Sequence, residues 1–253
     1  TMLSRRPGVT SVICVNSIRG SLRRDWAMNL VSQNGSPSSM STRTRFCVLT
    51  INSEFQGVYV LMEKLKRAGI NWLVLGIESA SQYVRDGVAK GAFTEDDIFD
   101  IVRRIQSHGI HIMGNYIFGL PDDTLASMRT TLDMAKNLHT EWANFYSAMA
   151  YPGSPLYAEA VRRGWPLPDH PGGPGWIGYS QHAYDTMPLP TDTLSGTEVL
   201  AFRDRAFDEY FADPDYQALV RKTFGQEPVD QIQRMLAHKL KRRHHHAPSA
   251  AAE

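Results

Sequence analysis

Two apolar stretches of this sequence stop at a glycine or a glutamate followed by small or acidic residues. The first is "WLVLGIESAS", where Glu78 and Ser79 follow the apolar run, and the second is "NYIFGLPDDT". A carboxylate buried at the end of a strand is costly unless it is paired, so Glu78 either faces solvent or has a hydroxyl or amine partner. We therefore consider Glu78 a candidate ligand contact, and a glutamate that caps a helix or forms a salt bridge is the structural alternative.

The second stretch also has two interpretations. Gly119 would allow a ligand to approach the backbone closely, and Pro121 fixes the turn that follows. Asp122, Asp123 and Thr124 can instead serve as N-terminal caps of the next helix. On spacing alone, capping is the simpler interpretation.

The sequence lacks the common motifs of other chemistries. Its nine histidines form no HxxxH or HExxH pair with acidic support, and His244–His246 lie in a charged tail that we expect to be solvated. Neither GxGxxG nor GxxxxGK[ST] occurs, and no Ser-His-Asp set has an interpretable spacing. Cys14 and Cys47 could form a disulfide, but the composition favours thiols in a reducing cytoplasm.

Composition points to a soluble globular protein. The 253 residues are 42% hydrophobic and 21% charged, and 27 Lys plus Arg nearly balance 26 Asp plus Glu. This balance gives no field that would steer the chain to nucleic acid or to a membrane surface. The sequence has no run of about 18 apolar residues and no convincing signal peptide, so we expect a cytoplasmic location.

Apolar periodicity indicates strands that alternate with helices. Continuous apolar runs predict strands at 71–77, 110–118 and 143–150, and apolar residues at helical spacing predict helices starting near 58, 94, 125 and 154. The repeat of about 35 residues is typical of βαβ units in a parallel sheet. Right-handed crossovers would place the carboxyl ends of all these strands on one side, where βα barrels bind their ligands. Tyr151, after the third strand, could stack on a planar ligand or only close the barrel.

The remaining segments differ in character. We expect 1–45 to be poorly defined, with a short strand near "SVICV" that has no clear partner, and 46–165 to form part of a barrel. An irregular Pro- and Gly-rich segment covers 166–196 and carries Trp176, Tyr179 and His182. Two helices are predicted within 197–243, the second from about 229. The tail "KLKRRHHHAPSAAAE" is basic and then small and polar, so we expect it to be frayed, with 244–253 disordered.

Several of these segments, in order, resemble a known family. "LGIESAS", "GNYIFGLPDDT", "AMAYPGSPLY" and "GWIGYSQHAYDTMPLPT" are similar to the later half of the catalytic barrel of radical S-adenosylmethionine (SAM) enzymes. The nearest likeness is to members whose N-terminal domain binds cobalamin, and it covers roughly residues 56–243. The resemblance implies an α/β fold: a partial (βα)6 TIM-like barrel with parallel strands and SAM at its carboxyl-terminal mouth.

The resemblance also implies a set of SAM contacts. Gly76, Glu78 and Ser79 would lie at the fourth barrel strand, where a polar side chain meets the ribose or the methionyl group. The fifth-strand motif, G-x-I-x-G-x-x-E in the family, reads here as Asn115, Ile117, Gly119 and Asp122, and its backbone would contact adenine. Tyr151 and Pro152 would close the nucleoside pocket.

The sequence departs from the family at the cluster loop. Family members hold a [4Fe–4S] cluster with three thiolates of a CxxxCxxC loop, whereas neither Cys14 nor Cys47 begins that motif. The cobalamin domain also has no counterpart here. We therefore expect the C-terminal portion of a SAM-dependent radical methylation or rearrangement enzyme that is inactive alone and acts on a small-molecule substrate.

Two alternatives remain open beside this expectation. A separate chain could carry the cluster and the cobalamin domain, or the chain could be a non-catalytic barrel remnant that acts as a binding or interaction module. An unrelated βα-barrel enzyme for phosphate or sugar substrates is a third hypothesis. The segment 166–196 could select the substrate or only plug the side of the barrel. Unpaired strand edges would make a half barrel prone to aggregation.

Overall fold

A computed structural model of the chain describes residues 12–16, 45–50, 58–87 and 94–243, with side chains from residue 62 onward. Its strands are β1 (Val12–Asn16), β2 (Arg45–Thr50), β3 (Ile70–Glu78), β4 (His111–Phe118) and β5 (Trp142–Ser147). Its helices are α2 (Val58–Arg67), α3 (Gln82–Gly87), α4 (Glu95–Ser107), α5 (Leu125–Leu138), α6 (Pro155–Arg163), α7 (Gly196–Phe211), α8 (Pro214–Phe224) and α9 (Gln226–Ala237). Among the described helices, none is long and apolar enough to cross a membrane.

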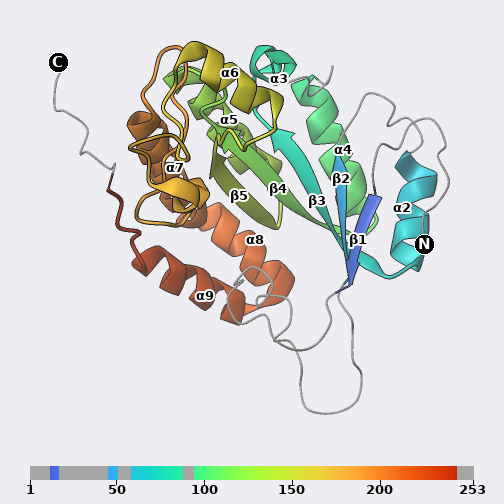
Figure 1. The fold of residues 1–253 in the computed structure, drawn as a ribbon. Helices are drawn as coiled ribbons and strands as arrows, with labels where there is room; N and C mark the ends of the chain where they lie inside the picture. Colours follow the sequence, from blue (N-terminus) through green and yellow to red (C-terminus); the bar gives the residue numbers. More distant parts are fainter. Residues whose placement is uncertain (1–11, 17–44, 51–57, 88–93, 244–253) are drawn as a thin grey trace. The chain divides into compact units, whose positions relative to one another are not determined.

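The strands form one sheet in the order β1-β2-β3-β4-β5 (Figure 1). β2 pairs parallel to β3, and helices connect β3 to β4 and β4 to β5. The prediction of an α/β fold with parallel strands is therefore confirmed. The prediction that the strand near "SVICV" lacks a partner is wrong, because β1 pairs antiparallel to β2, with Cys14 opposite Cys47 in the backbone register.

Helix starts follow the capping residues that the sequence supplies. Thr94 caps α4, because its hydroxyl accepts a bond from the Asp97 amide at 3.2 Å. The Asp97 carboxylate accepts a bond from the Thr94 amide at 3.0 Å, which completes the expected capping box. Thr124 caps α5 in the same way with Ser127. The capping interpretation of the segment after Pro121 is thus confirmed for Thr124.

The chain divides into two compact units. The first unit contains residues up to Ile77 together with 91–114 and 140–142, and the second contains 78–90, 115–139 and 143–253. In the first unit, α4 turns Ile98, Ile101, Val102 and Ile105 inward, and these side chains are buried as the periodicity predicts. The domain boundaries expected from the sequence follow composition rather than contacts and stay predictions.

An aromatic core holds the second unit together. The Phe118 and Phe145 rings stack with centroids 5.6 Å apart, and Phe202 of α7 meets Phe118 edge-on at 4.9 Å. Tyr210 of α7 packs edge-on against Phe145 at 5.2 Å. These contacts bury one face of β4 and β5 beneath α7 and leave the other face of these strands half-exposed.

The carboxyl-terminal part of the chain differs from expectation in two ways. The helix predicted from about residue 229 corresponds to α9, which starts at Gln226, and α8 before it was not predicted. Asp213 caps α8 at Pro214, and Gly225 separates α8 from α9. The basic segment after α9 was expected to be frayed up to its end. Instead, the Arg242 side chain is fully buried and pairs with Asp204 at 3.0 Å.

Candidate functional site

The half-exposed face of the parallel strands carries four of the eight residues predicted to bind a cofactor. Exposure alternates along each strand with the two-residue period of a sheet. The half-exposed positions near the carboxyl ends are Gly76 and Glu78 on β3, Asn115 and Ile117 on β4, and Asn144 and Tyr146 on β5. Four of these six were singled out from the sequence, and Asn144 and Tyr146 were missed.

Glu78 has an unusual backbone conformation in addition to its position at the end of a strand. It ends β3 with a φ of 66°, one of two non-glycine residues with positive φ among those described. Such a conformation costs a non-glycine residue about 1–2 kcal/mol and recurs at ligand sites. The left-handed turn bends the chain sharply just after the strand, so Glu78 is held at the rim by its backbone.

Ser79 is buried, and the structure uses it for local support. Its hydroxyl lies 3.2 Å from the hydroxyl of Thr131 on α5, which also accepts a bond from the Ala80 amide at 3.0 Å. Arg85 donates to the carbonyls of Ser79 and Ala80 at 2.5 and 2.7 Å. These bonds fix the turn after β3 and so hold Glu78 in position.

Two amides and a phenol line the face beside Glu78. The Asn144 amide donates to the Asn115 side-chain oxygen at 2.9 Å, which joins β5 to β4 by their side chains. Burial raises the pKa of Tyr146; Glu78 and Tyr151 also raise it, while Arg203 opposes them. The phenol of Tyr146 therefore lies within electrostatic range of both Glu78 and Tyr151 and is a neutral donor at pH 7.

A cluster of buried charges lies behind Tyr146. Arg203 donates to the Phe145 carbonyl at 2.8 Å and to Asp204 at 2.9 Å, and Arg242 forms two 3.0 Å bonds with the same carboxylate. Burial alone would raise the pKa of Asp204, but Arg242 and then Arg203 lower it overall. Burial, assisted by the two arginines, lowers the pKa of His182. His182 is therefore a neutral imidazole at pH 7.

Gly119 has a packing role that the sequence did not indicate. Its φ is 81°, and a Cβ built there would lie 2.4 Å from Cγ1 of Val199, so the space expected for a ligand is filled by α7. The amides of Gly119 and Leu120 donate to the buried carboxylate of Asp123 at 3.0 and 3.1 Å. Burial raises the pKa of Asp123, and its bonds to Ser127 and these amides oppose that rise. A cofactor contact of Gly119 stays a prediction.

The irregular segment covers the free edge of β5. Gln181 accepts a bond from the Ser147 amide at 2.9 Å and donates to the Ser147 carbonyl at 3.0 Å, as a neighbouring strand would. Arg203 satisfies the Phe145 carbonyl on the same edge. At the carboxyl end of β5, side chains of the second unit therefore bond the main-chain groups that an unpaired edge would leave open.

Tyr151 and Pro152 follow β5 and are exposed. The Tyr151 ring stacks on the Tyr179 ring with centroids 5.3 Å apart, and the centroid of the Trp176 ring lies 5.5 Å from that of Tyr179. The segment is thus in contact with the residue predicted to close the nucleoside pocket. Whether it selects a substrate stays a prediction.

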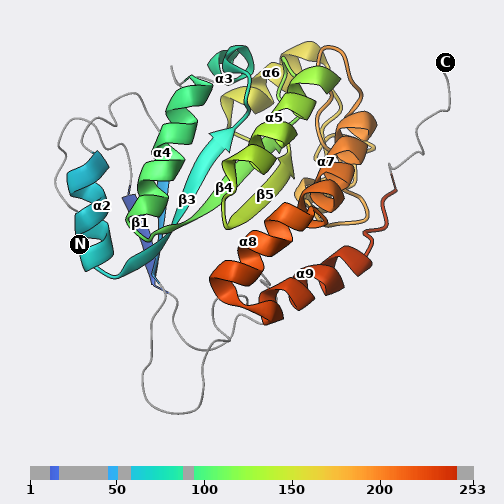
Figure 2. The ribbon, with the colours of Figure 1, turned by 180° about the vertical axis from the view of Figure 1, so that it is seen from behind.

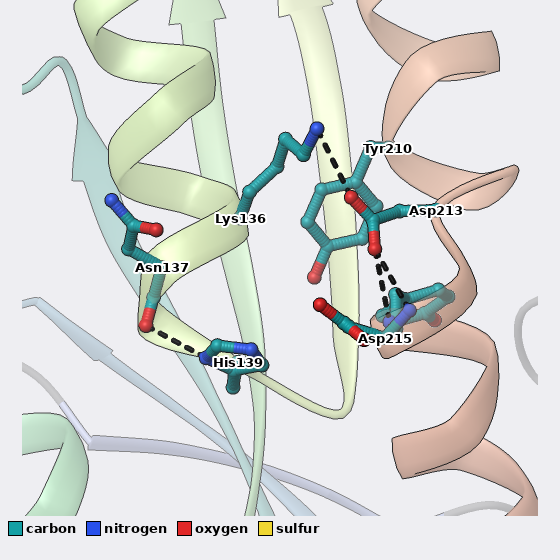
Figure 3. A pocket seen from close by; sticks show the side chains of 7 residues that line it. Lys136, Asn137, His139, Tyr210, Asp213 and Asp215 are labelled. Atoms are coloured by element: carbon teal, nitrogen blue, oxygen red, sulfur yellow. Dashed lines mark hydrogen bonds and ion pairs between the residues drawn. The ribbon is translucent and has the colours of Figure 1, made fainter.

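A separate pocket of about 200 Å³ lies where α5 ends and α8 begins (Figure 3). Lys136 pairs there with Asp213 at 3.0 Å, and Asp213 also caps α8 by accepting bonds from the Asp215 and Tyr216 amides. Because α5 ends just before β5 begins, this pocket lies by the amino end of β5. Glu78, in contrast, lies at the carboxyl end of its strand. The main charges of the pocket already pair with each other.

No group of three or more potential metal ligands occurs among the residues with described side chains. The side chains of Cys14 and Cys47 fall outside that part, so the sequence-based expectations for them stay predictions.

Comparisons with known proteins agree with the sequence pattern. Residues 26–135 match the family described as the Radical SAM superfamily. An uncharacterized methyltransferase of Pyrococcus horikoshii is 34% identical over 97 residues, and a bacteriochlorophyllide d C-12(1)-methyltransferase of Chlorobaculum tepidum is 28% identical over 97 residues. Each alignment covers 38% of this chain and 21% of the relative, so the chain matches about a fifth of their length.

Among solved structures, the radical SAM methyltransferase TsrM of Kitasatospora setae, with cobalamin and a [4Fe–4S] cluster bound, aligns with a TM-score of 0.41. Its sequence identity is 20%, and the alignment covers 46% of this chain and 21% of that protein.

Proposed function

We propose that this chain, whose residues 26–135 match the Radical SAM superfamily, is a member of that family and forms the SAM-side part of a methyltransferase. The observation that carries the proposal is the polar face at the carboxyl ends of the strands. There Glu78, Asn115, Asn144 and Tyr146 share the half-exposed side, with Glu78 in a left-handed turn. The methyltransferase names of the curated relatives favour methyl transfer over rearrangement.

The donor set of this face suits SAM. The Glu78 carboxylate can accept from ribose hydroxyls or from the methionyl ammonium, and it offsets the positive charge of the sulfonium. The Asn115–Asn144 pair and the Tyr146 phenol add neutral donors and acceptors for the remaining polar atoms. When bound, SAM supplies the methyl group or the radical, and the residues of this chain bind and orient it. Gly76, Ile117, Tyr151 and Pro152 would line the nucleoside end.

On this proposal, residues outside this sequence hold the [4Fe–4S] cluster and the cobalamin. A [4Fe–4S] cluster needs clustered thiolates, and this sequence has two cysteines, neither of which opens a CxxxCxxC motif. We therefore assign the thiolates and the cobalamin domain to another polypeptide or segment that docks beside this one. On this proposal the chain binds SAM by itself and turns over only with that partner.

Calorimetric titration of SAM into the chain tests the proposal. Binding should weaken about tenfold in Glu78→Gln, because a charge-assisted bond is lost while the shape is kept. Glu95→Gln is the matched control, since Glu95 is an exposed glutamate at the start of α4. No SAM binding by the wild type, or equal binding by both variants, would refute the proposed site.

The second candidate, a non-catalytic binding module, is favoured by one observation. Gln181 and Arg203 satisfy the free edge of β5 within this chain, so this edge needs no further barrel strand. A chain that melts cooperatively as a monodisperse species and binds no SAM would support this candidate over the first.

A further inference from the structure

Three aromatic side chains form a continuous surface in the second unit, which we call the aromatic platform: Tyr151, Tyr179 and Trp176. Tyr179 is buried at the centre, with the Tyr151 ring 5.3 Å away on a stacked geometry and the Trp176 ring 5.5 Å away and tilted by 46°. The outer two rings are left open, since Tyr151 is 51% and Trp176 is 71% exposed. Large aromatic groups contribute little to stability when they remain in water, so their placement here calls for another reason.

The platform is rigid although it belongs to an irregular segment. The Tyr179 hydroxyl donates to Asp169 at 2.7 Å, and the Tyr157 hydroxyl donates to the other oxygen of that carboxylate at 2.9 Å. A Cβ on Gly178 would lie 2.7 Å from both Pro168 and Pro174, so the backbone is packed as tightly as it can be. Exposed rings on a fixed backbone lose little entropy when a ligand stacks on them.

The platform continues the strand-end site. Tyr151 lies four residues after the end of β5, and the Tyr146 phenol of β5 lies within electrostatic range of both Tyr151 and Glu78. Tyr151 is therefore the residue that links the platform to the strand-end site.

The size of the platform suits a small ligand. A large aromatic side chain buries roughly 150–250 Å², so the open parts of two such rings amount to roughly 300 Å² or less. A specific protein partner needs about 800 Å² on each side. No unpaired charge marks the platform for an ion, because both oxygens of Asp169 already accept bonds from tyrosines.

We propose that the aromatic platform binds a planar aromatic ring of the substrate by stacking on Trp176, with Tyr151 as the wall shared with the SAM site. This proposal rests on the proposed function only in calling the bound ring part of a substrate. Ring binding itself is independent of SAM, of the cluster and of turnover.

Saturation-transfer NMR on the whole chain tests the proposal, with indole and cytidine as planar probes and cyclohexanol and ribose as saturated controls. The planar probes should receive saturation and the saturated controls should not. Trp176→Ala should weaken planar-probe binding about tenfold, as loss of one stacking partner does for nucleobases. Tyr83→Ala is the matched control, because Tyr83 is an exposed aromatic residue of the same unit, 72% exposed, on α3 away from the segment 166–196.

Each other outcome overturns the proposal in a different way. Equal loss in both variants, or equal transfer to planar and saturated probes, means nonspecific contact. Displacement of the probes by saturating SAM means that the platform is part of the nucleoside pocket. A wild-type dimer in sedimentation that Trp176→Ala makes monomeric means that a second copy of the chain covers the rings. SAM titration separates the two proposals. If Trp176→Ala binds SAM as the wild type does but loses probe binding, both proposals are supported. If the wild type binds no SAM, only the proposed function is refuted.

Discussion

Gly119→Ala should destabilise the second unit through a contact that the sequence does not show. The substitution places a methyl group 2.4 Å from Cγ1 and 2.9 Å from Cγ2 of Val199, a fully buried residue of α7. The φ of 81° adds a second penalty, because a side chain disfavours the left-handed region. Both effects act on the folded state, so the free energy of unfolding should fall.

The two penalties can be separated. Left-handed backbone costs alanine about 1–2 kcal/mol, and overpacking a tight core costs about 1–3 kcal/mol, so Gly119→Ala should lose about 2–5 kcal/mol. Gly164→Ala is the control for strain alone: its φ is 66° and nothing lies within 4 Å of the added Cβ. That variant should lose only about 1–2 kcal/mol.

Urea unfolding of the wild type, the two alanine variants, Val199→Ala and the Gly119/Val199 double variant measures these terms. Val199→Ala removes the two methyl groups nearest the new Cβ and leaves only the Val199 Cβ at 3.2 Å. In that background Gly119→Ala should therefore cost little more than Gly164→Ala. Losses that add fully in the double variant, or a Gly119→Ala loss no larger than that of Gly164→Ala, would show that the close contact with α7 is wrong.

Three further substitutions have definite expected outcomes. Thr131→Val removes the acceptor of the Ala80 amide and should lower the free energy of unfolding by about 1–3 kcal/mol in urea titrations, whereas the exposed neighbour Thr130→Val should change it little. The pKa of Asp204 is lowered from 3.8 in the folded state, so its contribution is present above that pH and is lost as pH falls through the folded pKa. Asp204→Asn should therefore destabilise at pH 7 by about 3 kcal/mol and flatten the acid branch of a stability–pH curve; an unchanged acid branch would contradict the buried pairing with arginine. Gln181→Ala should increase amide exchange at Ser147 more than elsewhere on β5, and unchanged exchange would show that the edge is covered otherwise.

The sequence predicted the parallel strands and their helices because their apolar period is strong and local. The runs at 71–77 and 110–118 became β3 and β4 within one residue at each end, and the capping box at Thr94 formed as expected. The third strand was predicted too long, since β5 stops at Ser147. At Ser147 the Gln181 side chain takes the place of a neighbouring strand. A single side chain in that role leaves no periodic pattern in the sequence.

The candidate site was predicted in outline but not in its supports. Glu78 could be chosen from its position at a strand end, and Asn115 and Ile117 from the motif that the family resemblance implies. The structure places all three on one half-exposed side. Asn144 and Tyr146 were missed, although alternation along β5 would have put them on that side had its register been read. The contact of Val199 with Gly119 joins residues far apart in sequence, and no local pattern indicates it.

Amide hydrogen exchange with and without SAM shows whether SAM binds at the carboxyl ends of the strands. We predict protection at these ends of the three parallel strands, in residues 78–80, 115–120 and 144–151, and no change around the pocket beside Lys136. Glu78→Gln should reduce that protection at the same SAM concentration. An exchange pattern that SAM leaves unchanged, or protection confined to the end of α5 and the start of α8 (Figure 2), would contradict a SAM site on this face.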